Sequence, residues 1–141
     1  MSIDHTKCDI TGMVERHIMI AVDSSDNARR AVLFVGDFFG CYDGFQVTLL
    51  HIILEPEATY FRDNDERQKW LADQRGESEK MMKEYKHILV DAGFPGDNVN
   101  VRVDTMRAPS VADCIIKEQH EMKCCTIVIG RRGLSKKEAF I

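Results

Sequence analysis

The sequence has no apolar run long enough to cross a membrane and no apolar core near its first residue. Its longest apolar candidates, residues 47–54 and 126–129, fall short of the roughly 18–20 residues that a spanning helix needs. The first fifteen residues carry Asp4, His5 and Lys7 where a secretory signal requires an apolar segment. We therefore expect no membrane partner and no export.

An excess of positive charge is also missing. The 141 residues include 19 Lys and Arg against 23 Asp and Glu, for a net charge of −4. Proteins that bind DNA or RNA draw much of their affinity from phosphate neutralisation and usually carry the opposite sign. The composition thus disfavours nucleic acid as a partner.

Cysteine pairs at metal-site or redox spacing are absent. The five cysteines, an odd number without C-x-x-C spacing, are Cys8, Cys41, Cys114, Cys124 and Cys125. This excludes a zinc ribbon and disfavours a disulfide framework. Cys124 and Cys125 are adjacent in a predicted strand and would point to opposite faces. We predict plain buried thiols in a reducing cytoplasm.

No arrangement of nucleophile, base and orienting group is evident. There is no Gly-x-Ser-x-Gly motif, and the histidines lack metal-ligand spacing. His51 lies within an apolar strand and is interpreted as a packed core residue. The sequence therefore does not favour an enzyme.

The sequence does contain alternating strand and helix patterns, and 44% of its residues are apolar, enough for one domain. Residues 1–15 lack periodicity and are predicted to be a flexible lead-in to a domain spanning 16–141. Short β-branched runs predict strands, and longer stretches with helical spacing separate them. The predicted strands are residues 17–22, 45–54, 99–103 and 124–129. This order predicts an α/β fold, a Rossmann-like doubly wound parallel sheet.

Each predicted helix has a start signal and an apolar stripe. Ser24, Ser25 and Asp26 are good N-caps for the first helix, and a proline at 109 suits the start of the third. A charged stretch over 57–69 precedes the second helix, and the alternation over 99–103 indicates an edge strand. The stripes are Ala28, Ala31, Val32, Val35 and Phe38 or Phe39; Leu71, Ser78, Met81 or Met82, Tyr85, Ile88 and Leu89; and Val111, Ala112, Ile115, Ile116 and Gln119.

Two loops at strand ends are candidates for a binding site. In an open α/β sheet, ligands bind beyond the carboxyl ends of the strands where the winding reverses. Asp23 follows the first strand, and Gly130-x-x-Gly133 follows the fourth. Glycines allow close approach to a phosphate, and a carboxylate can accept hydrogen bonds from ribose. Each feature alone is weak, because the glycines can simply form a turn and Asp23 can simply cap a helix.

Four motifs resemble the universal stress protein family. They are Ile-Ala-Val-Asp-Ser-Ser at 20–25, Leu-Leu-His-Ile-Ile at 49–53, Arg-Ala-Pro at 107–109 and Ile-Val-Ile-Gly-Arg-Arg-Gly-Leu-Ser at 127–135. The resemblance runs in order over residues 16–141. It implies strand order 3-2-1-4, usually with a fifth strand, a homodimer and, in one branch, an ATP site.

By the same resemblance, specific residues are expected to contact an adenine nucleotide, either AMP or ATP with Mg²⁺. Adenine and ribose contacts fall on Ala21, Asp23, Ile52 and Ile129, and the phosphate turn falls on Gly130 and Gly133. Arg131 and Arg132 lie between these glycines in a locally basic segment. That segment either attracts phosphates or is a solvated basic turn.

The sequence departs from the family pattern in three places. The second half of the phosphate motif, Gly-Ser or Gly-Thr, would begin at position 143, beyond Ile141. We therefore expect a C-terminally truncated domain whose fifth strand is missing or supplied by another chain, with self-association along the fourth strand. Arg107 replaces a common glycine, and Ala21 stands where some ATP binders have proline.

The favoured interpretation is a noncatalytic stress-response protein that binds an adenine nucleotide and acts through dimer or partner contacts, with at most slow ATP hydrolysis. The alternative is a nucleotide-free dimeric interaction module of the same fold. A nucleotidyl- or sulfur-transfer enzyme is disfavoured, because residues 23–27 contain no glycine-rich loop.

Overall fold

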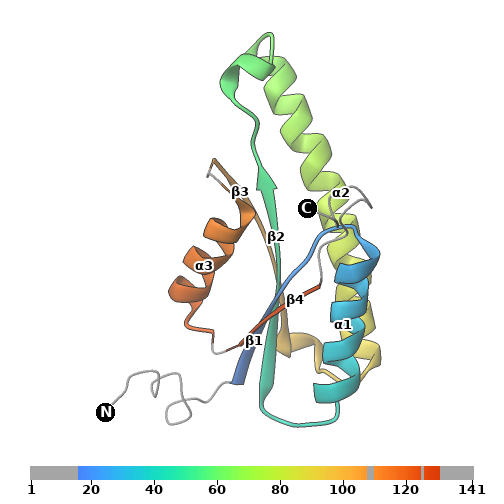
Figure 1. Ribbon diagram of the computed structural model, residues 1–141. Coiled ribbons are helices and arrows are strands. Elements are labelled where there is room, and N and C mark those ends of the chain that lie inside the picture. The colour runs from blue at the N-terminus through green and yellow to red at the C-terminus, as the bar shows by residue number, and fades with distance from the viewer. Residues whose placement is uncertain (1–15, 108–109, 125, 131–141) are drawn as a thin grey trace, which may run out of the picture.

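The computed structural model describes residues 16–107, 110–124 and 126–130, which form a parallel sheet with helices on both faces (Figure 1). The strands are β1 (Arg16–Ala21), β2 (Phe45–Leu54), β3 (Val99–Met106) and β4 (Thr126–Ile129), and the helices are α1 (Asp26–Phe39), α2 (Asn64–Asp91) and α3 (Val111–Met122). The strand order β3-β2-β1-β4 confirms the predicted doubly wound fold. The predicted lead-in over 1–15 lies outside the described residues.

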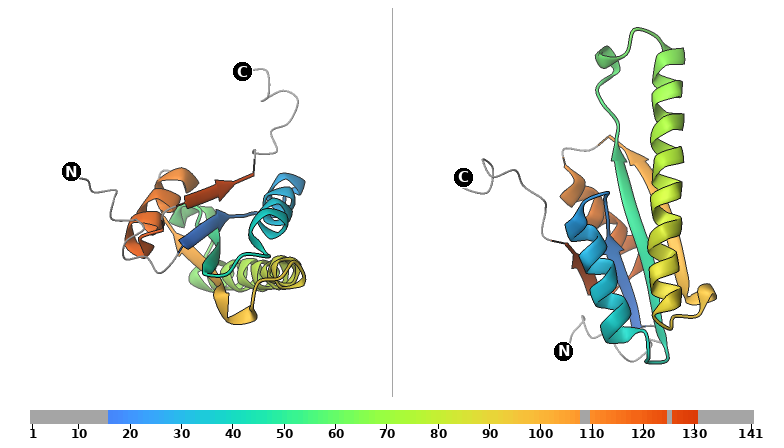
Figure 2. Two further views of the ribbon diagram at one scale, coloured as in Figure 1. Left: turned by 90° about the horizontal axis from the view of Figure 1, so that it is seen from below. Right: turned by 90° about the vertical axis from the view of Figure 1, so that its right-hand side faces the viewer.

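Alternate side chains of the strands feed two apolar layers. Ile20 and Leu49 lie in the layer that α1 and α2 cover, whereas Met19 and Leu50 lie in the layer beneath α3. Figure 2 shows α1 and α2 together on one face of the sheet and α3 alone on the other. Because successive strand residues point to opposite faces, the near-continuous apolar character of β2 matches cover on both sides.

The winding reverses beside β1. Its last residue, Ala21, pairs with Leu50 of β2 on one side and with Ile129 of β4 on the other. The chain leaves β1 through α1 toward β2 and later returns through α3 to β4. The carboxyl ends of β1 and β4 therefore lie side by side at the point where the winding changes direction, which is where crevices form in open α/β sheets.

Local capping explains where α1 and α2 begin. The Ser25 side chain accepts from the Ala28 amide at 3.1 Å, and the Asp63 carboxylate accepts from the Glu66 amide at 2.8 Å. We expected α2 to follow the charged stretch over 57–69, but it begins inside that stretch at Asn64, because the charged residues occupy its solvated first turns. This early start carries α2 beyond the carboxyl end of the sheet (Figure 1).

The structure decides between two alternatives in α1 and corrects the predicted face of α3. In α1, Phe39 packs against the core and Phe38 is 59% exposed. In α3, Ile116 is 55% exposed, and the fully buried line instead contains Glu118, which lies 2.8 Å from the Arg102 guanidinium. A count of apolar positions misses this line, because Glu118 is an acidic residue that lies beside Arg102 of β3.

The cysteines follow the prediction only in part. Cys114 and Cys124 are buried free thiols, and burial raises the pKa of Cys124 to about 11. Cys41 was predicted to be buried but is exposed, because it follows the C-cap of α1 at Gly40. Cys8 and Cys125 lie outside the described residues.

The two outer strands differ from each other. The predicted edge position of β3 is confirmed, and Val101 on its outer face is exposed. The apolar β4 pairs with β1 alone within the described ranges, and Ile129 is 59% exposed. In the part of the chain that the structure describes, no helix is both long and apolar enough to cross a membrane.

Candidate functional site

A cavity of about 570 Å³ opens at the carboxyl ends of β1, β2 and β4. Five residues predicted for the site line it together: Ala21, Asp23, Ile52, Ile129 and Gly130. The remaining predicted residues, Arg131, Arg132 and Gly133, lie outside the described residues. The other lining residues are Val22, Ser25, Ala28, Leu50, His51, Leu54, Ser110, Val111, Ala112 and Ile115.

Gly130 brings the exit of β4 against the start of α1. A Cβ atom at this position would lie 2.2 Å from the Asn27 carbonyl oxygen and 2.9 Å from the Ala28 amide nitrogen. No side chain tolerates such a distance from backbone atoms, so glycine is required for this close approach. The first of the two predicted turn glycines therefore joins the two loops that flank the cavity.

Asp23 lies at the rim of the cavity with half of its carboxylate engaged. Its Oδ1 accepts from the Ser25 amide at 2.8 Å, whereas Oδ2 has no hydrogen-bond partner among the described residues. The alternative that Asp23 caps α1 directly is wrong, because Ser25 is the N-cap. Asp23 instead shapes the turn that precedes the cap.

The sequence suggested that His51 is a packed core residue. In the structure it is instead half-buried and lines the cavity. Its Nδ1 lies 2.8 Å from the Val22 carbonyl oxygen. Because a carbonyl can only accept, Nδ1 must carry the proton, which leaves Nε2 as an acceptor in the neutral ring. The apolar run around His51 concealed this role, since its ring reaches the end of β1 only after the strands pair.

The start of α3 forms a wall that the sequence did not assign to the site. The Ser110 side chain accepts from the Asp113 amide at 3.2 Å and caps the helix, and Val111, Ala112 and Ile115 continue the wall. The signal was available in principle, because the helix leading to β4 must begin near the carboxyl edge of the sheet. Sequence periodicity does not show which side of the helix faces the crevice.

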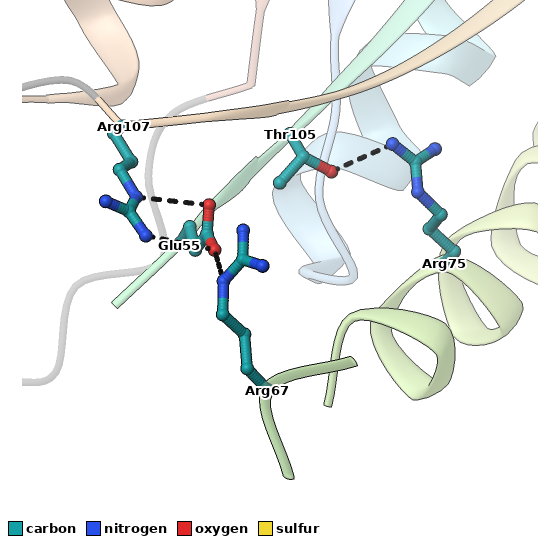
Figure 3. A network of polar contacts seen from close by, with 5 residues as sticks. All are labelled: Glu55, Arg67, Arg75, Thr105 and Arg107. Carbon is teal, nitrogen blue, oxygen red and sulfur yellow. Dashed lines mark hydrogen bonds and ion pairs between the residues drawn. The ribbon is translucent and has the colours of Figure 1, made fainter. Parts of the chain in front are cut away.

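An ion-pair network joins the ends of β2, β3 and α2 beside the cavity (Figure 3). The Glu55 side chain, only 7% exposed, accepts from Arg67 and, at 3.3 Å, from Arg107. Hydrogen bonds from Arg67 and then Arg107 lower the pKa of Glu55. Arg75 donates to Thr105 at 3.0 Å in the same region. Arg107, directly after β3, therefore links the end of β3 to the end of β2.

Comparison with known proteins identifies the family. The model of the universal stress protein family matches residues 15–141, so the chain belongs to this family. No curated protein matches significantly.

Solved structures share the fold. A universal stress protein family member from Burkholderia pseudomallei is 15% identical with a TM-score of 0.65, and the match covers 85% of this chain and 84% of that one. Hypothetical protein MJ0577 is 22% identical with a TM-score of 0.67, covering 88% and 82%. A universal stress protein in complex with cAMP is 20% identical with a TM-score of 0.62, again covering 88% and 82%.

Proposed function

We propose that this chain is a noncatalytic, cytoplasmic stress-response protein that binds an adenine nucleotide in the cavity and acts through homodimer or partner contacts. The observation that carries the proposal is the convergence of Ala21, Asp23, Ile52, Ile129 and Gly130 around one cavity at the switch point. A structural neighbour described as bound to cAMP supports an adenine nucleotide as the ligand class.

The chemistry of the described residues fits the adenosine half of such a ligand. Ala21, Ile52 and Ile129 offer apolar surface for a base. Asp23 Oδ2, which accepts no hydrogen bond from a described residue, suits a ribose hydroxyl. At the other end, Gly130 lines the cavity and brings the end of β4 against the start of α1. AMP and ATP both contain this shared half.

A metal ion would enter with the ligand rather than reside in the protein. Asp23 is the one carboxylate among the described lining residues, and no group of three or more His, Cys, Asp or Glu within the described ranges suits a metal. Mg²⁺ would thus accompany the phosphates of ATP.

Blocking the cavity tests the proposal. Ala112 lines the cavity on the exposed side of α3, so Ala112→Phe should fill it and weaken binding of AMP and ATP at least tenfold, about 1.4 kcal/mol. Isothermal titration calorimetry with and without Mg²⁺ measures this.

The matched control is Ala72→Phe, an exposed α2 position outside the cavity lining, which should leave binding unchanged. Equal affinities in the two variants would place the ligand elsewhere. No heat with any adenine nucleotide would contradict the proposal.

The alternative, a nucleotide-free interaction module, is favoured by one observation. Phe34 and Phe38 are both exposed on α1, and their tilted rings are in contact with centroids 4.5 Å apart. Exposed aromatic side chains in a group are typical of contact surfaces. Partner capture that is lost in Phe34→Ser and indifferent to adenine nucleotides would support this second function.

A further inference from the structure

The turn between β1 and α1 is held from two distant parts of the chain. His51 of β2 donates from Nδ1 to the Val22 carbonyl at 2.8 Å, and Tyr85 of α2 donates from its hydroxyl to the Asp23 carbonyl at 2.7 Å. These acceptors are consecutive carbonyls at the end of a strand. Within the described ranges, these two side chains are the partners that the structure gives the two carbonyls.

The hydrogen bond from Tyr85 lies in the interior of the protein. Tyr85 is 4% exposed, and burial, followed by the nearby Asp23 charge, raises the pKa of its hydroxyl. The neutral hydroxyl therefore remains a donor at physiological pH. The Val22 amide also donates to the Leu50 carbonyl at 2.8 Å, so the residue before Asp23 is tied to β2 through both its backbone groups.

These contacts determine where the Asp23 carboxylate lies. The Ser25 amide donates a hydrogen bond to Oδ1. The position of the backbone then determines the direction in which Oδ2 points. Tyr85 is 62 residues from Asp23 in sequence, and His51 is 29 residues from Val22. The two contacts thus fix the position of the turn relative to β2 and α2. Strand β2 also carries Ile52, which lines the cavity.

We propose that Tyr85 and His51 are positioning residues that hold Asp23 in the orientation in which it accepts ribose hydroxyls. This inference rests on the proposed function for its ligand. It adds two residues that touch the backbone of the site rather than the nucleotide's ribose.

Tyr85→Phe tests the inference with a pair of ligands. AMP carries the ribose hydroxyls that Asp23 would hold, and 2′,3′-dideoxyadenosine monophosphate lacks them. We expect AMP to bind about fivefold more weakly to Tyr85→Phe, as for one lost hydrogen bond, and the dideoxy ligand to bind as it does to the unaltered protein. In an Asp23→Ala background, Tyr85→Phe should have no further effect on AMP.

Two controls separate positioning from general destabilisation. Tyr42→Phe removes a hydroxyl from an exposed tyrosine and should change neither ligand's affinity. His51→Asn keeps an N–H group near the place of Nδ1 and should largely retain AMP affinity, whereas His51→Leu should lose it. Equal weakening of both ligands in Tyr85→Phe, or no weakening of AMP, would overturn the inference.

Amide hydrogen exchange tests the positioning without any ligand. In Tyr85→Phe, the amides of Ser24 and Ser25 should exchange at least fivefold faster, while that of Ile20 in β1 stays unchanged. Unaltered exchange in the turn would overturn the positioning role. If the unaltered protein binds no adenine nucleotide, the proposed function fails, and exchange alone then decides whether the two side chains hold the turn.

Discussion

At the scale of single residues, a glycine can be required by its neighbours rather than by its backbone dihedrals. Gly44 has a φ of +87° and open space around it, so its conformation is the reason for glycine. Gly130 has no such φ, but backbone atoms of α1 occupy the place of a Cβ. The two positions therefore respond to substitution for different reasons.

Gly130→Ala should destabilise the protein by about 1–3 kcal/mol, because the added methyl group forces β4 away from α1. Chemical denaturation measures the change. Gly76→Ala is the matched control, since nothing lies within 4 Å of a Cβ there and the helix should gain up to about 1 kcal/mol. Equal effects of the two substitutions would contradict the close contact at Gly130.

At the scale of elements, α3 is joined to β3 through a buried charge. The Glu118 Oε1 atom lies 2.8 Å from an Arg102 nitrogen, but the geometry is not that of a hydrogen bond. Arg102 also donates to Asp104 at 3.0 Å. Burial, and then the neighbouring Asp104 carboxylate, raise the pKa of Glu118 above its usual 4.5, and this outweighs the opposing effect of Arg102.

The raised pKa predicts a pH dependence of stability. The folded protein holds this proton more tightly than the unfolded chain, so Glu118 favours folding most below about pH 4.5. That contribution is lost as the pH rises through the raised pKa. Glu118→Gln stays neutral, so its free energy of unfolding relative to the unaltered protein should rise across this window, as urea titrations at several pH values would show.

Glu121→Gln is the control for this pH series, because Glu121 lies on the same helix with its side chain half exposed. Its stability difference from the unaltered protein should stay nearly constant over the same pH range. A constant difference for Glu118→Gln as well would show that the pKa of Glu118 is not raised by folding, which would contradict the prediction.

At the scale of the whole molecule, β4 presents apolar side chains at an edge of the sheet. An apolar edge strand with unpaired backbone groups tends to pair with another chain. We expect the 141-residue chain to self-associate along β4. Thr126→Lys, which places a charge on this exposed strand position, should shift the mass measured by light scattering toward that of the monomer.

Phe34→Ser serves as the control for this experiment, because it removes an exposed apolar side chain from α1 and leaves β4 unaltered. It should leave the mass unchanged. A monomer at high concentration for the unaltered chain would contradict the expectation, and dissociation by Phe34→Ser alone would move the contact to α1.

Apolar periodicity and capping residues, which act over a few neighbouring positions, predicted the element order and the exact bounds of β2. The strand order was predicted from the family resemblance, and the structure confirms it. The resemblance then placed Asp23, Ile52 and Gly130 in one site, and they do line one cavity. These features could be predicted because they depend on local patterns and on the handedness of crossovers.

The tertiary structure alone decided which polar side chains turn inward. His51 and Tyr85 look like members of apolar stripes, yet each reaches a carbonyl of the β1–α1 turn. Glu118 looks like a solvated residue, yet it lies buried beside Arg102. Their partners are 16 to 62 residues away in sequence. A hydrogen bond or ion pair at that separation exists only after the sheet and helices have packed, so no local pattern encodes it.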